Sequence, residues 1–174
     1  DVAARCLVHQ IEEAEIIQEP FPHIYLKGVF PSEFYNRMAK DLPENKDFTP
    51  FNNLYPNGKL SPFRSIYTGK SMFWSSFLDG LEKGPTGAAL CKKFGLSEGV
   101  TTTRLIRDFP GYSLGPHTDV PAKLLSALFY IPIAEGAAGT TFYTCSDGFT
   151  DRGEGHYEKE GFDKVWETPF DPNS

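Results

Sequence analysis

The residues of this chain best suited to chemistry are His117 and Asp119, which lie two positions apart after a turn-rich segment. In an extended strand, side chains at positions i and i+2 point to the same side, so this imidazole and this carboxylate can reach a single metal ion. Thr118 lies between them and points to the other side. A simpler interpretation is a histidine at the end of a strand that forms a hydrogen bond with a nearby aspartate. The spacing by itself leaves both interpretations open.

The segments on either side of the pair have the composition of strands and turns. Residues 101–109 are strand-like, and a Pro-Gly and then a Gly-Pro dipeptide separate them from the pair. Residues 124–131 have high β-propensity, and a further strand is predicted at residues 140–144 after a loop that contains two glycines. This context favours a pair of metal ligands at the end of a strand.

The arrangement resembles the iron(II) and 2-oxoglutarate-dependent dioxygenases, in particular their prolyl-4-hydroxylase-like branch. The matching motifs are Phe109-Pro110-Gly111, His117-Thr118-Asp119, Tyr130-Ile131-Pro132 and Gly139-Thr140-Thr141-Phe142-Tyr143. A weaker match lies at residues 20–31, which look like the segment that opens many bacterial members of the family. Residues 165–174 look like the strand and turn just before the family's second metal-binding histidine. Residues 44–99 carry no matching motif.

The resemblance implies a double-stranded β-helix, the cupin-like jelly roll, which binds metal where strand ends converge at the mouth of the sandwich. His117 and Asp119 would be two ligands of a facial triad that holds Fe(II). The open positions of such a metal accept 2-oxoglutarate and dioxygen, and ascorbate is the expected reductant. The implied reaction is hydroxylation of a peptidyl or small-molecule C–H bond, with release of succinate and carbon dioxide.

The resemblance also assigns roles to residues around the pair. Tyr130 matches a tyrosine whose hydroxyl binds the distal carboxylate of 2-oxoglutarate, and a core tyrosine with a satisfied hydroxyl is an equal alternative. Thr141 lies on a strand expected to line the same pocket. Arg107 and Tyr112 are candidates for positioning an anionic substrate or cosubstrate, and a solvated strand face is the alternative for Arg107. Lys123 is expected to be a surface charge.

The chain departs from the family pattern at its C-terminal end. In the family, the distal metal histidine and the Arg or Lys that binds 2-oxoglutarate follow beyond the position of Asn173-Ser174, so we expect a domain without its last strands. His156 is the only histidine after Asp119, and its Gly-rich surroundings predict a loop residue near the mouth, with a loop ligand of the metal as the alternative. Two ligands alone hold Fe(II) weakly.

Two other functions fit the same residues. A catalytically inactive jelly-roll module for binding or assembly would explain the missing ligands, and an exposed sheet edge would then favour a homodimer. A cupin-like protein that uses another divalent metal would keep the same histidine and aspartate as ligands. The sequence leaves these alternatives open.

The elements that must position the pair follow from hydrophobic spacing. Apolar residues recur at helical intervals in segments before residue 95, and short strands between Gly and Pro turns follow from residue 100. The predicted helices lie within residues 1–19, 31–43, 71–81 and 86–94, with a strand at 23–29 and a loop at 47–63. We therefore expect one domain over residues 1–174 that is mainly β, with helices mainly at 31–95 and jelly-roll strands mainly at 100–174.

Composition limits the expected partners. The 174 residues are enough for a sizeable core, and the aromatic share of 14% favours β-rich packing. A formal net charge of −6 predicts no nucleic-acid partner. No apolar stretch or signal peptide points to a membrane, so a cytoplasmic protein with a small-molecule or peptidyl substrate is expected. The three cysteines are widely spaced and are expected to be free thiols.

Overall fold

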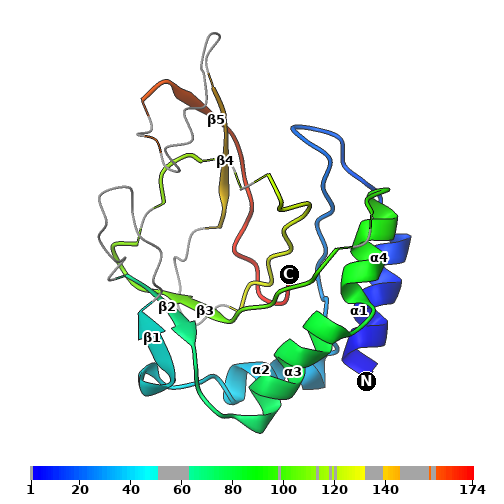
Figure 1. The fold of residues 1–174 in the computed structure, drawn as a ribbon, viewed down its shortest axis with the longest axis vertical. Coiled ribbons are helices and arrows are strands. Elements are labelled where there is room, and N and C mark those ends of the chain that lie inside the picture. Colours follow the sequence, from blue (N-terminus) through cyan, green and yellow to red (C-terminus); the bar gives the residue numbers. More distant parts are fainter. Residues whose placement is uncertain are drawn as a thin grey trace.

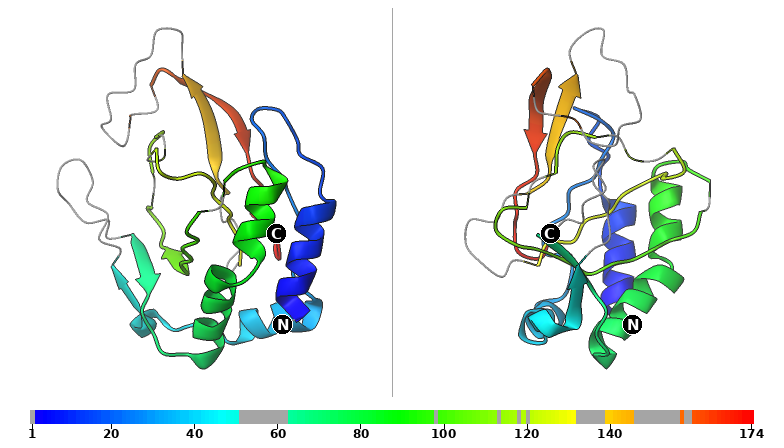
Figure 2. Two further views of the ribbon diagram at one scale, coloured as in Figure 1. Left: turned by 45° about the vertical axis from the view of Figure 1, so that its right-hand side comes forward. Right: turned by 60° about the vertical axis from the view of Figure 1, so that its left-hand side comes forward.

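The fold was described from a computed structural model in which helices lie on one side of the molecule and strands on the other (Figure 1), an arrangement that two further views repeat (Figure 2). The described residues are 2–50, 63–97, 99–112, 114–117, 119, 121–131, 139–145, 157 and 160–174. Their helices are α1 (Val2–Glu13), α2 (Ser32–Lys40), the short 3-10 helix η1 (Asn45–Asp47), α3 (Met72–Lys83) and α4 (Thr86–Lys93). Their strands are β1 (Phe48–Pro50), β2 (Arg64–Tyr67), β3 (Ile106–Asp108), β4 (Thr141–Cys145) and β5 (Phe162–Glu167).

The helices form where apolar residues recur on one face. In α1, the buried residues Ala3, Leu7 and Ile11 are four positions apart and face α4. At the start of α3, the Ser71 hydroxyl accepts a hydrogen bond from the backbone N–H of Trp74 and caps the helix. All predicted helices are confirmed.

The longest helices among the described residues, α1 and α3, have 12 residues each. A bilayer requires about 20 apolar residues, and none of the helices in the described ranges is long and apolar enough to cross one.

The hydrophobic core lies among the helices. Its buried apolar residues come from α1 to α4 and from the segment before α2: Ala3, Leu7, Ile11, Val29, Phe30, Met38, Trp74, Leu81 and Ala89. The ring of Phe30 contacts Phe77 of α3 and Phe129, with centroids 5.5 and 5.6 Å apart. Phe129 thereby attaches the segment after the His-Asp pair to the helical core.

The strands form two small antiparallel sheets that do not close on each other. One sheet has the order β1-β2-β3, and the other pairs β4 with β5, with an irregular register between Phe142 and Tyr143. Strand β1 lies where the sequence predicted a loop, because its backbone finds a partner in β2. The described part of the chain is therefore mixed α and β rather than mainly β.

The predicted strands differ in outcome. The strand at 140–144 is confirmed as β4, and the one at 101–109 is confirmed over β3. Residues 124–131, all described, form no strand, and residues 23–29 form only an isolated bridge between His23 and Ile17. High β-propensity selects side chains that suit a sheet, but a strand also needs a regular series of hydrogen bonds to a neighbouring backbone. Among the described residues, these two segments make only isolated backbone bonds, such as Tyr130 to Ser174 and Val29 to Asn173.

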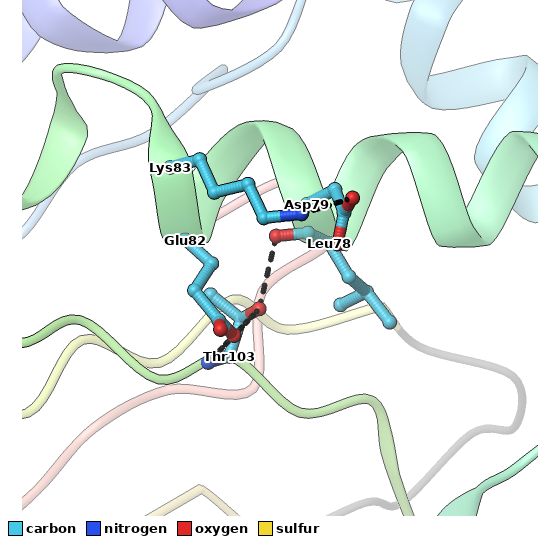
Figure 3. A network of polar contacts seen from close by, with 5 residues as sticks. All are labelled: Leu78, Asp79, Glu82, Lys83 and Thr103. Carbon is cyan, nitrogen blue, oxygen red and sulfur yellow. Dashed lines mark hydrogen bonds and ion pairs between the residues drawn. The ribbon is translucent and has the colours of Figure 1, made fainter.

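The segment before β3 is fixed to the helical side of the molecule through Thr103 (Figure 3). The Thr103 hydroxyl donates a hydrogen bond to the carbonyl oxygen of Leu78 at 3.0 Å, and its backbone N–H donates to the Glu82 carboxylate at 3.1 Å. Both acceptors belong to α3. These bonds hold the chain in place as it approaches β3 and the turn that leads to His117.

The last described residues join the N-terminal half to the segment after the pair. Asn173, at a φ of 58°, accepts a hydrogen bond from the Phe30 backbone N–H and donates one to the Phe30 carbonyl, at 2.8 and 2.9 Å. An Asn side chain tolerates this left-handed conformation better than most residues. The backbone N–H of Tyr130 donates to the Ser174 oxygen at 3.0 Å. This segment therefore anchors one end of residues 121–131.

Candidate functional site

His117 lies on an exposed, non-helical segment that follows the Gly-Pro bend. Its Nδ1 is 2.9 Å from the carbonyl oxygen of Gly115. A carbonyl only accepts hydrogen bonds, so this contact favours the tautomer with the proton on Nδ1 and the lone pair on Nε2. Metal-binding histidines commonly donate their other ring N–H to a backbone carbonyl in this way. The contact is therefore compatible with a metal-binding role of Nε2, which stays a prediction.

The bend that carries His117 is held by the backbone of Tyr157. The Tyr157 N–H donates to the Pro116 carbonyl at 2.8 Å, and Pro116 itself is buried. On the other side of the bend, a Cβ at Gly115 would collide with the carbonyl oxygen of Tyr157. Glycine at this position is therefore required by the close approach of two backbones.

Asp119 is exposed and anchored by two residues that follow it. The Nζ of Lys123 is 2.9 Å from its Oδ2, and the Ser126 hydroxyl lies 3.4 Å from the same oxygen. Oδ1 is therefore the carboxylate oxygen that can bind a metal without breaking either contact. Lys123 is an exposed surface charge, as the sequence predicted. Its ion pair with Asp119 was not predicted, because a turn at residues 121–122, rather than a predicted element, brings the lysine back to Asp119.

The donor types at His117 and Asp119 fit a divalent metal, but they supply two ligands. Among the residues that the structure describes, no group of three or more His, Cys, Asp or Glu side chains is placed to hold a metal ion. His156, the predicted loop ligand, lies outside the described residues, as does Thr118. The third ligand is thus not identified by the described part of the chain.

Tyr130 has a fully engaged hydroxyl. Its Oη lies 2.8 Å from the Thr140 hydroxyl and 2.9 Å from the Thr168 hydroxyl, and it accepts the backbone N–H of Thr140 at 3.2 Å. A phenolic hydroxyl has one proton and two lone pairs, so these three contacts use its whole capacity. This geometry suits the alternative of a core tyrosine with a satisfied hydroxyl, while cosubstrate binding by Tyr130 stays a prediction.

Arg107 is turned toward the loop before β1. Its guanidinium donates to the Asn45 side chain at 2.5 Å and to the Pro43 carbonyl at 2.7 Å, and it stacks 4.3 Å from the centroid of the Phe48 ring. Arginine often combines such planar hydrogen bonding with stacking on an aromatic ring. These contacts join β3 to η1 and β1, so Arg107 is not simply part of a solvated strand face. Its role in positioning an anionic substrate or cosubstrate stays a prediction.

Tyr112 and Thr141 also have partners within the chain. The guanidinium of Arg64 lies 4.1 Å from the centroid of the Tyr112 ring and donates two hydrogen bonds of 2.6 Å to the Asp108 carboxylate. The Thr141 hydroxyl donates to the Glu167 carboxylate across the β4–β5 pair at 3.3 Å. The predicted ligand-binding roles of Tyr112 and Thr141 stay predictions.

Two hollows found among the described residues lie away from the pair. One, of about 400 Å³, is lined by the ends of α3 and α4 and by residues 99–101. The other, of about 440 Å³, lies between α1 and α4. Neither is lined by His117 or Asp119, and both of these residues are exposed.

The geometry thus brings Asp119 together with Lys123 and Ser126, and it brings Tyr130 together with two threonines. It also gives Arg107 and Tyr112 partners on β1 and β2. Comparisons with protein-family models, with curated proteins and with solved structures find no match to this chain.

Proposed function

We propose that this chain is an iron(II) and 2-oxoglutarate-dependent oxygenase domain of the prolyl-4-hydroxylase-like type, with a jelly-roll fold. The observation that carries the proposal is the orientation of His117, whose Nδ1 contact with the Gly115 carbonyl favours a lone pair on Nε2. An exposed carboxylate follows two residues later and is anchored through one oxygen only. The antiparallel pairing of both small sheets supports the jelly-roll part of the proposal.

Each residue of the pair has a defined task in this proposal. His117 supplies a neutral nitrogen ligand, and the close packing of Gly115 against Tyr157 keeps the imidazole in place. Asp119 supplies an anionic oxygen ligand, which lowers the charge of the metal site. Bound Fe(II) with 2-oxoglutarate would supply the oxidation of a C–H bond of a peptidyl or small-molecule substrate. A third ligand outside the described residues, with His156 as one candidate, would complete the site.

Metal binding tests the proposal directly. Calorimetric titration of the full chain with Mn²⁺, a redox-stable substitute for Fe(II), should give a site that His117→Ala and Asp119→Ala each weaken by about tenfold or more. His9→Ala is the matched control, because His9 is an exposed histidine on α1. Circular dichroism checks that every variant is folded. Equal affinities in all four proteins would contradict the assignment of the ligands.

Turnover separates the oxygenase from its alternatives. Incubation with Fe(II), ascorbate and 2-oxoglutarate should release succinate, and the release should fall in the His117 and Asp119 variants. A folded chain that binds no metal and releases no succinate would instead favour the inactive binding module. Metal binding without 2-oxoglutarate turnover, with a different metal found by elemental analysis of the purified protein, would favour the cupin-like alternative.

A further inference from the structure

The ion pair between Lys123 and Asp119 places a positive charge on a proposed metal ligand. Nζ and Oδ2 are 2.9 Å apart, and the side chains are 44% and 49% exposed. The Ser126 hydroxyl lies 3.4 Å from the same oxygen, a longer contact than the ion pair. We propose that Lys123 competes with the metal for Asp119 and thereby lowers the affinity of the site for divalent cations. This inference rests on the proposed function, because it requires Asp119 to be a metal ligand.

Electrostatics gives the direction of the effect. A carboxylate that binds a divalent metal while Lys123 stays in contact holds two cations next to each other, and like charges at such separations repel. Lys123 can also move away from Asp119, since an exposed ion pair contributes little free energy. The free energy of that ion pair is then lost when the metal binds, which lowers the net affinity for the metal. In both cases the lysine opposes metal binding, and in the metal-free protein it neutralises Asp119.

The test compares three substitutions by calorimetric titration of the full chain with Mn²⁺. Lys123→Met removes the charge and keeps a side chain of similar length, and we expect it to tighten binding by about two- to tenfold. Lys123→Arg keeps the charge and should stay close to the wild-type affinity. Lys83→Met is the matched control, because Lys83 forms the same kind of exposed i,i+4 ion pair with Asp79 at 2.7 Å, on α3 (Figure 3).

Ionic strength distinguishes repulsion from a structural role of the lysine. Between about 50 and 500 mM salt, the gain from Lys123→Met should shrink, since screening weakens interactions between exposed charges. A structural role would leave the ratio of the two affinities unchanged.

The outcomes separate this inference from the proposed function. Affinity that is unchanged or weaker in Lys123→Met, while the wild type binds Mn²⁺, would overturn the competition and leave the metal site intact. A gain of equal size in Lys83→Met would also overturn it, because the effect would then reflect net charge. If no variant binds Mn²⁺, both the competition and the metal site are wrong.

Discussion

The hydroxyl of Tyr130 offers the sharpest test of the described structure, because two roles have been considered for it. Tyr130→Phe removes one oxygen atom and keeps the ring, which packs against Phe170 with centroids 4.7 Å apart. In the structure this oxygen connects Thr140, just before β4, with Thr168, just after β5. If the hydroxyl is structural, its loss should lower the free energy of unfolding.

The size of the loss follows from the three contacts of the hydroxyl. The backbone N–H of Thr140 keeps a second acceptor, the Thr168 hydroxyl, at 2.8 Å, so its bond to Tyr130 is replaced. The two contacts with the threonine hydroxyls, at 2.8 and 2.9 Å, are lost. At about 1 kcal/mol for each net hydrogen bond, the free energy of unfolding should fall by about 2 kcal/mol.

Urea unfolding followed by tryptophan fluorescence measures this change. If the dependence of the unfolding free energy on urea concentration is the same in both proteins, the substitution has changed only the stability. Tyr143→Phe is the matched control, because it removes the same atom from a tyrosine in β4 that takes no part in the contacts of Tyr130 with Thr140 and Thr168. We expect the control to change stability by less than about 0.5 kcal/mol. A Tyr130→Phe protein as stable as the control, with 2-oxoglutarate affinity reduced about tenfold, would refute the structural role and favour cosubstrate binding.

Two further predictions concern a close backbone contact and a pH dependence. Gly115→Ala should weaken Mn²⁺ binding several-fold, because its Cβ would push against the Tyr157 carbonyl and move the bend that carries His117, a proposed metal ligand. Gly80→Ala, which meets open space on α3, should leave binding unchanged in the same titration. Hydrogen bonds led by that of Lys27 hold the pKa of the Asp171 carboxyl below its ordinary value of 3.8. The contribution of this carboxylate to stability is therefore present above about pH 4 and lost as the pH falls through the lower folded pKa. The difference in melting temperature between wild type and Asp171→Asn should disappear at the acid end of this window, and a difference that persists there would contradict the assignment.

Local sequence patterns predicted the helices well. The start of α3 was readable because Ser71 is a good N-cap and the apolar residues that follow recur at helical intervals. The Pro110-Gly111 dipeptide also predicted a turn, and in the structure Gly111 adopts a φ of 94°, which glycine tolerates best. These signals lie within a few residues of the structure that they specify.

Contacts between distant segments could not be read in the same way. Residues 124–131 have the composition of a strand, yet they contribute Phe129 to the helical core instead of pairing in a sheet. The hydrogen bond from Arg107 on β3 to the Asn45 side chain was not predicted either, because the two residues lie far apart in the sequence. Which backbone or side chain lies opposite a residue depends on the whole fold, and propensity carries no information about it.

The sequence by itself determined which residue types could bind a metal, since only side-chain chemistry and a two-residue spacing enter that inference, and it located the helices through periodicity. The tertiary structure decided how those residues are oriented. It placed the Gly115 carbonyl at the His117 ring and brought Lys123 and Ser126 to one oxygen of Asp119. Orientation depends on turns and on contacts such as that of Tyr157 with the Gly-Pro bend, where residues about 40 positions apart in the chain meet. Such contacts arise only when the chain has folded.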